Sequence, residues 1–134
     1  MSLIFDKKYK LDSSENFDDY MKALGVGMIT RKVGNSISPI VELNKGDDDK
    51  YTLKSTSTFK NTSTVFKMGE QFDEETLDGR KVKSIITQEG NKLVHKQIGD
   101  KVETTIVREF KPDELKMILT VNDIICTRIY KPVE

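Results

Sequence analysis

The stretch that decides the fold reads Asn16-Phe17-Asp18-Asp19-Tyr20-Met21-Lys22-Ala23-Leu24-Gly25-Val26-Gly27. Its apolar residues recur at spacings of three and four positions, and they are Phe17, Tyr20, Met21 and Leu24. This spacing predicts one apolar face of a short helix. Asn16 is the expected N-cap, and Gly25 can end the helix in a left-handed conformation.

The segments on either side of this helix also have a readable pattern. Residues 6–12 are predicted to form a short strand. A second short helix is expected after Gly27, and Pro39 closes that segment. The residues that we expect on one apolar face of the second helix are Ile29, Val33 and Ile37.

From Ile40 onward no helical period persists, and short β-prone runs alternate with turn sequences. The candidate turns are Gly46-Asp47-Asp48-Asp49, Met68-Gly69, Asp78-Gly79, Gly90-Asn91, Gly99-Asp100, Lys111-Pro112-Asp113-Glu114 and Asn122-Asp123. Together with the first strand, this spacing predicts about ten antiparallel strands.

Sequential hairpins favour an up-and-down meander, and closing such a sheet into a barrel removes its exposed edges. A β-sandwich is the competing architecture. The helix pair between the first two strands favours an all-β, ten-stranded antiparallel barrel capped by a helix-turn-helix lid. With 134 residues, the chain is expected to be one domain over residues 1–134.

Composition narrows the function classes. The 22 basic and 22 acidic residues balance, so nothing suggests the basic footprint of a nucleic-acid-binding protein. The single cysteine, Cys126, excludes an internal disulfide and suits a reducing compartment. Neither a signal peptide nor a membrane span is visible, so a cytoplasmic protein is expected.

Two strands near the C-terminus carry candidate binding residues. Strand alternation places Arg128 and Tyr130 on one face of the last strand, and Arg108 on a face of the strand over residues 101–110. Each arginine could lie on a solvated face, and both faces of these strands are mixed. If both point inward, they form a cationic site that requires an anion, since an unpaired buried charge is very costly. A carboxylate suits the guanidinium fork.

Several segments resemble the intracellular fatty-acid-binding protein family over the whole chain, most of all its heart, adipocyte and myelin type subgroup. The N-terminal match combines Lys7-Lys8-Tyr9-Lys10-Leu11 with residues 16–27. Further matches are Ser57-Thr58-Phe59-Lys60-Asn61-Thr62, Phe72-Asp73-Glu74-Glu75-Thr76, Asp78-Gly79-Arg80-Lys81-Val82-Lys83-Ser84, Lys92-Leu93-Val94-His95 and Cys126-Thr127-Arg128-Ile129-Tyr130.

The resemblance implies a monomeric carrier, not an enzyme, that binds one long-chain fatty acid such as palmitate or oleate and uses no cofactor. The family's carboxylate-binding trio falls on Arg108, Arg128 and Tyr130. Its acyl-channel residues correspond to Phe17, Tyr20, Met21, Leu24, Val26, Pro39, Ser57, Phe59, Asp78, Arg80, Ile106, Met117 and Leu119. Retinoic acid is the alternative ligand, because its carboxylate would satisfy the same arginines.

The resemblance also implies how the lipid is delivered. Relatives in this subgroup transfer lipid on contact with membranes, and a basic rim of Lys22, Arg31 and Lys32 would favour anionic bilayers. A solvated helix face is the simpler interpretation of these charges. A similar basic trio is associated with nuclear import in adipocyte-type relatives, which adds a nuclear fraction to the expected location.

The remaining candidates have ordinary interpretations. His95 is the only histidine and has no cysteine or histidine cluster beside it, so we expect a strand residue and no metal site. Cys126 is expected to be a buried apolar residue, although Arg128 nearby could lower its pKa and make it sensitive to oxidants. The sequence shows no arrangement of a nucleophile, a base and a group that orients the base, so no enzyme is predicted.

Overall fold

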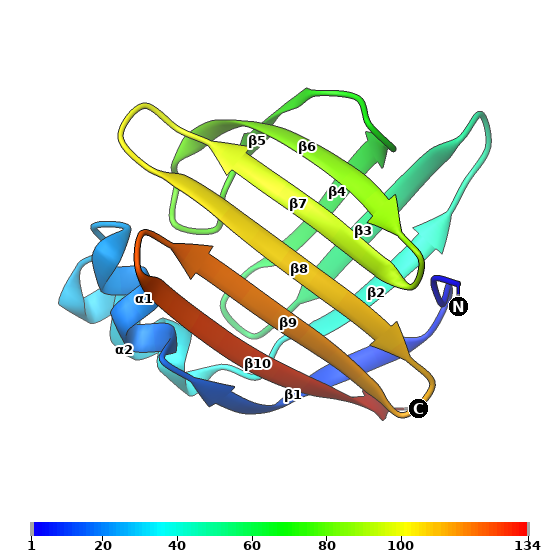
Figure 1. The fold of residues 1–134 in the computed structure, drawn as a ribbon. Coiled ribbons are helices and arrows are strands. Elements are labelled where there is room, and N and C mark those ends of the chain that lie inside the picture. Colours follow the sequence, from blue (N-terminus) through cyan, green and yellow to red (C-terminus); the bar gives the residue numbers. More distant parts are fainter. Residues whose placement is uncertain (1, 134) are drawn as a thin grey trace.

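A computed structural model describes residues 2–133, which form ten strands and two short helices (Figure 1). The elements in chain order are β1 (Lys8–Glu15), α1 (Phe17–Ala23), α2 (Met28–Ser36), β2 (Ile40–Lys45), β3 (Lys50–Thr56), β4 (Asn61–Lys67), β5 (Phe72–Glu75), β6 (Lys81–Glu89), β7 (Lys92–Ile98), β8 (Glu103–Lys111), β9 (Glu114–Val121) and β10 (Ile124–Val133). Neither helix is long and apolar enough to cross a membrane.

All strands belong to one antiparallel sheet in the order β4-β3-β2-β1-β10-β9-β8-β7-β6-β5. Neighbours in the sheet are neighbours in the chain, except that the first strand, β1, pairs with the last, β10. The two helices lie together at one end of the barrel (Figure 1). The predicted ten-stranded meander with a helical lid is therefore confirmed, and each predicted turn joins two strands.

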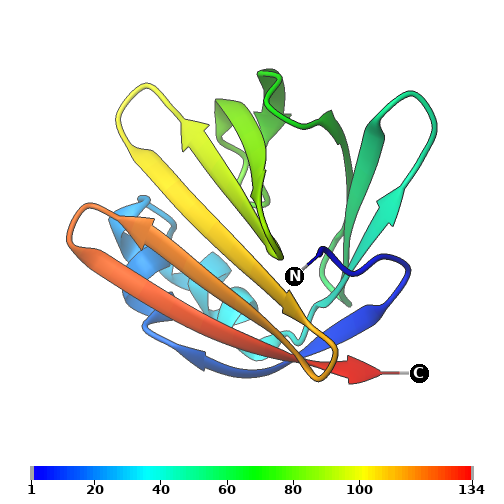
Figure 2. The ribbon, with the colours of Figure 1, turned by 45° about the vertical axis from the view of Figure 1, so that its right-hand side comes forward.

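The barrel is nearly closed, because β4 and β5 stand at the two ends of the strand order and are not hydrogen-bonded to each other. Figure 2 shows these two strands curling towards one another. The rings of Phe66 on β4 and Phe72 on β5 stack across this gap, with centroids 6.4 Å apart. Side-chain packing thus replaces the backbone ladder that complete closure would require.

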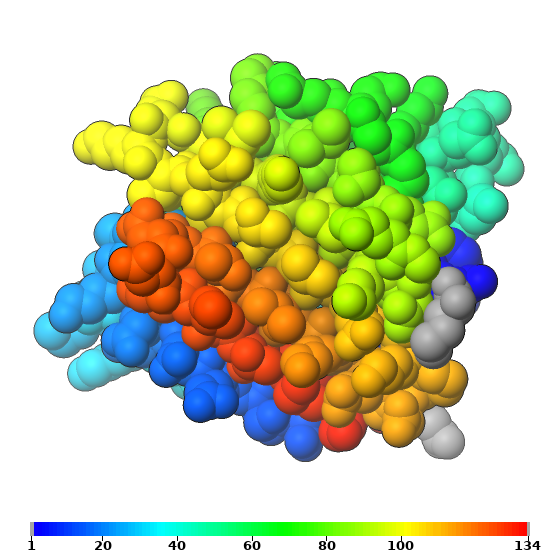
Figure 3. Space-filling view, in the orientation of Figure 1, coloured from blue at the N-terminus to red at the C-terminus, as the bar shows by residue number. Residues whose placement is uncertain are grey.

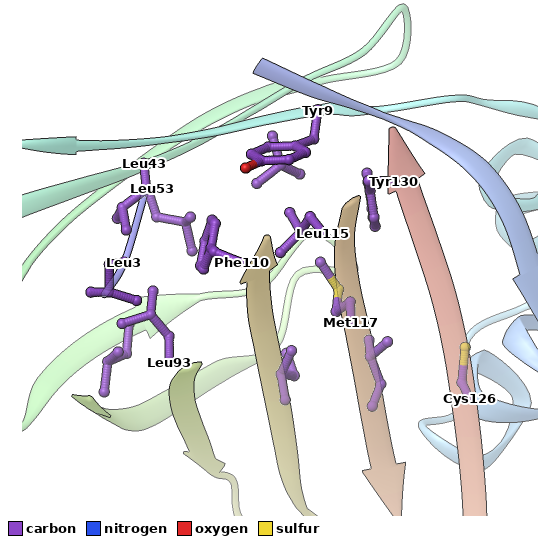
Figure 4. Close-up of a cluster of buried hydrophobic side chains, with 14 of the residues drawn as sticks. Leu3, Tyr9, Leu43, Leu53, Leu93, Phe110, Leu115, Met117, Cys126 and Tyr130 are labelled. Atoms are coloured by element: carbon purple, nitrogen blue, oxygen red, sulfur yellow. The ribbon is translucent and has the colours of Figure 1, made fainter. Parts of the chain in front are cut away.

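The end of the barrel away from the helices is filled by a packed apolar core (Figure 4). Tyr9, Leu43, Leu93, Phe110 and Leu115 have no exposed surface there. The Tyr9 hydroxyl donates to the main-chain oxygen of Lys111 at 2.8 Å, so its polar atom is satisfied. We call this set of five residues with its neighbours the closed end. On the outside, side chains cover the strands from β7 to β10 continuously (Figure 3).

The helices differ from the sequence prediction in two details. Asn16 occupies the N-cap of α1 in a left-handed conformation and makes no capping bond; its Nδ2 donates instead to the main-chain oxygen of Ile125 at 3.1 Å. The apolar face predicted for α2 is only partly present, because Val33 and Ile37 are half-buried and Ile37 lines the interior, whereas Ile29 is 82% exposed. Gly25 adopts a positive φ of 86°, as expected for a residue that ends a helix.

Candidate functional site

Between the helices and the closed end lies a cavity of about 240 Å³. One buried water needs only ~10–15 Å³ of such space, so the interior is hollow rather than imperfectly packed. Of the predicted site residues, those that line this cavity are Phe17, Tyr20, Met21, Leu24, Val26, Pro39, Phe59, Asp78, Arg80, Ile106, Arg108, Met117, Leu119, Arg128 and Tyr130.

Ser57 is the exception among the predicted cavity residues. It follows the end of β3, and its hydroxyl accepts hydrogen bonds from the main-chain N–H groups of Phe59 and Lys60 at 3.2 and 3.1 Å. It also donates to the main-chain oxygen of Lys60 at 3.0 Å. Ser57 therefore shapes the β3–β4 turn, and Ser55, two residues earlier on the strand, faces the cavity instead.

The strands β8 and β10 present the predicted anion-binding trio to the interior. Arg108, Arg128 and Tyr130 are 9%, 3% and 3% exposed. Figure 4 shows Tyr130 and Met117 projecting inward from β10 and β9. The sequence left the direction of both arginines open, and the structure turns both to the inside.

Arg128 faces the cavity without an acidic partner among the described residues. Its guanidinium lies 3.7 Å from the centroid of the Phe17 ring on α1. A cation over an aromatic face is stabilised only partly by that contact, so much of the cost of burying the charge remains. Arg128 is therefore a cation in the cavity that an anionic ligand would stabilise.

Arg108 is in a different situation, because it is linked to a carboxylate through a histidine. Its Nη1 donates to Nδ1 of His95 at 3.1 Å, and Nε2 of His95 donates to Oε1 of Glu74 at 2.9 Å. Since Nδ1 accepts from a guanidinium, the imidazole proton is assigned to Nε2. Arg108, His95 and Glu74 thus form a buried relay from β8 through β7 to β5. We call these three residues the relay.

The ionisation of the relay follows from its surroundings. Burial, together with the charge of Arg108, lowers the pKa of His95 against the opposing pull of Glu74, so the ring is neutral at pH 7. Burial alone would raise the pKa of Glu74. The interactions with His95 and the hydrogen bonds from Ser84 and Gln97 outweigh this effect of burial and lower the pKa of Glu74 to about 2. Glu74 is therefore a partly buried anion.

Glu74 was not predicted as a site residue, and His95 was predicted to be an ordinary strand residue. Glu74 also accepts from Oγ of Ser84 at 2.6 Å and from Nε2 of Gln97 at 3.2 Å. The available signal was alternation, because His95 and Gln97 share the inward face of β7 with Leu93. Alternation could not show which strands meet across the interior.

Cys126 is fully buried on the inward face of β10. Burial raises its pKa to about 11, although the charge of Arg128 and a hydrogen bond with Ser14 act in the opposite direction. The idea that Arg128 makes this thiol sensitive to oxidants is therefore wrong, because a thiol with so high a pKa carries almost no thiolate at neutral pH.

The cavity opens towards the helices and the β3–β4 and β5–β6 turns. Phe59 and Leu77, which lie on these turns, are 51% and 47% exposed. Asp78 binds Nε of Arg80 at 2.8 Å and accepts from the Thr76 hydroxyl at 2.6 Å, so this ion pair is compensated locally. We call this region the lid end.

Of the predicted basic rim, Lys22 and Lys32 are exposed on the two helices. Arg31 is held differently. Its Nε lies 3.1 Å from Oδ1 of Asp18, and its Nη1 donates to the main-chain oxygen of Val26 at 2.7 Å. Arg31 therefore joins α2 to α1, and the two lysines are the freely exposed charges of the rim.

Comparison with known proteins decides the family. The profile described as "Lipocalin / cytosolic fatty-acid binding protein family" matches residues 7–133. The chain belongs to this family. A muscle fatty acid-binding protein of Schistocerca gregaria is 57% identical over 125 residues, which covers 92% of each chain.

Solved structures of fatty-acid-binding proteins have the same fold. The brain fatty acid-binding protein of Drosophila melanogaster superposes with a TM-score of 0.90 at 61% identity, covering 95% of this chain and 98% of that one. The Schistosoma mansoni fatty acid binding protein in complex with arachidonic acid gives 0.92 at 45% identity, covering 97% of this chain and 96% of that one. The relatives support fatty acid binding for the family to which this chain belongs.

Proposed function

We propose that this protein binds one long-chain fatty acid non-covalently inside the barrel and carries it through the cytoplasm as a monomer. The observation that carries the proposal is Arg128, a buried cation that faces the cavity with no acidic partner in the described part of the chain. A carboxylate would accept charge-assisted hydrogen bonds from Arg128, and the Tyr130 hydroxyl would add a donor. Arg108, which is held in place by the relay, would assist Arg128 in binding the carboxylate.

The acyl chain would supply most of the affinity. Each methylene removed from water contributes ~0.8 kcal/mol, so a palmitate chain sums to about 12 kcal/mol before the costs of ordering and lost freedom. Apolar side chains such as Met21, Leu24 and Ile106 line the cavity along which it would lie. The arginine then selects an acid and fixes its direction.

We further propose that the lid end delivers the lipid by touching anionic membranes. Lys22 and Lys32 are exposed there, and Met28 and Ile29 at the start of α2 are 63% and 82% exposed. Exposed apolar residues beside basic ones suit the boundary between lipid headgroups and acyl chains. A nuclear fraction would need the same exposed charges, and fractionation of cells tests it separately.

Mass spectrometry of lipid extracted from the purified protein, followed by titration of delipidated protein, tests the proposed function. We expect long-chain fatty acids in the extract and one oleate bound per barrel. Retinoic acid is the alternative, and an excess of retinoid in the extract would replace the fatty acid as ligand. Binding of an oligonucleotide instead of either lipid would overturn the proposal altogether.

A further inference from the structure

The charged side chains inside the cavity include more than the predicted anion-binding trio of Arg108, Arg128 and Tyr130. Three charged side chains lie deep in it, which are Glu74, Arg108 and Arg128. Asp78 and Arg80 also line it, but their ion pair at 2.8 Å cancels locally. The remaining charged residues of the lining, Lys54 and Glu75, are exposed and of opposite sign.

Glu74 compensates Arg108 rather than Arg128. Its Oε1 is 2.9 Å from Nε2 of His95, whose Nδ1 is 3.1 Å from Nη1 of Arg108. The His95 side chain is 2% exposed and that of Glu74 14%, so water screens this chain of bonds weakly. The hydrogen bonds from Ser84 and Gln97 fix the carboxylate in this position.

The deep charges therefore sum to one uncompensated positive charge. Arg128 has Phe17 over its guanidinium and no carboxylate within ion-pair distance among residues 2–133. A ligand head group with one negative charge would neutralise the interior completely. A neutral head group would leave Arg128 unpaired, and a doubly charged one would bring an excess negative charge into a weakly screened site.

We propose that Glu74 determines the charge of the ligand: by neutralising Arg108 through His95, it leaves a single free cation and makes the cavity selective for monoanionic lipids. This inference rests on the proposed function and deepens it. Glu74 is a specificity-determining residue that acts through Arg108 and His95. It does so although its negative charge, taken alone, would disfavour any anionic ligand.

The inference predicts how the preferred ligand changes with the internal charge. Glu74→Gln raises the free positive charge to two, which favours a dianionic head group. Arg108→Gln leaves Glu74 and Arg128 to balance each other, which favours a neutral one. The double variant restores a single free cation, and with it the preference for a monoanion, although both original partners are gone.

The test uses three lipids with the same alkyl chain, which are palmitate, hexadecanol and hexadecyl phosphate. At about pH 8 the phosphate monoester is a dianion, since its second pKa is near 6, and His95 is neutral. The delipidated protein is incubated with equal amounts of all three, and mass spectrometry measures the ratios that are bound. Each ratio compares ligands on one variant, so a uniform loss of affinity cancels.

For the wild type we expect palmitate to dominate the bound lipid. Glu74→Gln should raise the ratio of phosphate to palmitate by about tenfold, which equals about 1.4 kcal/mol. Arg108→Gln should raise the ratio of hexadecanol to palmitate by a similar factor. Glu70→Gln is the matched control, because Glu70 is exposed on the β4–β5 turn and does not line the cavity, so its ratios should equal those of the wild type.

Unchanged ratios in Glu74→Gln overturn the inference, and so does a double variant that fails to return to palmitate. If Glu74→Gln does not fold, Arg108→Gln and the double variant still decide the matter, because the inference predicts opposite preferences for them. Failure of the wild type to bind palmitate would instead refute the proposed function. The two failures are thus distinguishable.

Discussion

The two ends of the barrel interior use apolar residues in opposite ways. At the closed end, Tyr9, Phe110 and Leu115 have no exposed surface and fill the space between the strands. At the lid end, Phe59 is half exposed, Ile29 is 82% exposed, and α2 buries no residue. The comparison indicates that the closed end supplies the stability of the fold, whereas the lid end leaves apolar surface free for the ligand and its entry.

The largest effect expected from this division is on stability. Phe110→Ala should lower the free energy of unfolding by about 3–5 kcal/mol, because it opens a hole in a packed core. Urea denaturation measures the loss. Phe59→Ala is the matched control at the lid end, and it should stay within about 1 kcal/mol of the wild type since half of the ring is already in water. Equal losses in both variants would remove the distinction between the ends.

The relay makes the free energy of unfolding depend on pH in the acidic range. The pKa of Glu74 is about 2 in the folded protein, below its ordinary value of 4.5, so its contribution is complete above about pH 4.5 and is lost as the pH falls towards 2. The loss amounts to up to about 3 kcal/mol. His95 acts in the same direction from pH 6.5 downward, because its folded pKa is lowered too.

Urea denaturation as a function of pH measures this acid dependence. The free energy of unfolding should fall from about pH 6.5 downward in the wild type, and Glu74→Gln should flatten the part of the curve below about pH 4.5. The exposed variant Glu75→Gln should follow the wild type. A slope in Glu74→Gln as steep as in the wild type would show that other carboxylates are responsible.

A smaller effect is expected on transfer to membranes. Lys22→Glu combined with Lys32→Glu should slow lipid transfer to anionic vesicles, since each charge near such a surface is worth about 1 kcal/mol. Raising the salt concentration should slow wild-type transfer, because screening weakens the attraction. Lys50→Glu, at the β2–β3 turn away from the helices (Figure 1), is the control and should transfer like the wild type.

If transfer by the wild type depends on neither vesicle concentration nor salt, the lipid leaves by diffusion and the contact proposal fails. Arg31 is unsuitable for this test. It is paired with Asp18 at 3.1 Å, so its replacement would disturb the helix pair as well as the surface charge.

The smallest effect is expected at Phe59, which lines the cavity opening from an exposed turn. Phe59→Ala should speed ligand release severalfold with little change in equilibrium affinity, because entry and exit would accelerate together. Stopped-flow mixing with a fluorescent fatty acid measures both rates. A release rate equal to that of the wild type would show that this ring does not obstruct the opening.

The same contrast explains what the sequence could predict. Strand alternation placed Arg128 and Tyr130 on one face but left open which face points inward, and the family resemblance supplied that direction. The turn residues marked the strand ends. Contacts between distant strands were not readable. His95 meets Glu74 only because β5, β6 and β7 are paired in a particular register, in which Phe72 opposes Ser84 and Ile86 opposes His95.

Local deviations from regular structure were also beyond prediction. The family resemblance predicted Ser57 as a cavity residue, but the chain bends after Thr56 and turns its hydroxyl to the main chain. Asn16 has the composition of a cap, yet its side chain reaches Ile125 on β10 instead. In both cases a polar side chain found a main-chain partner that only the folded protein provides.

The most direct test of the central claim compares oleate with oleyl alcohol in the wild type and in Arg128→Gln. The claim is that Arg128, the unpaired buried cation, holds the carboxylate. Displacement of a fluorescent fatty acid should therefore show oleate weakened about ten- to a hundredfold by the substitution, as expected for loss of a charged hydrogen bond, with oleyl alcohol nearly unchanged. Equal losses for the acid and the alcohol would contradict the account.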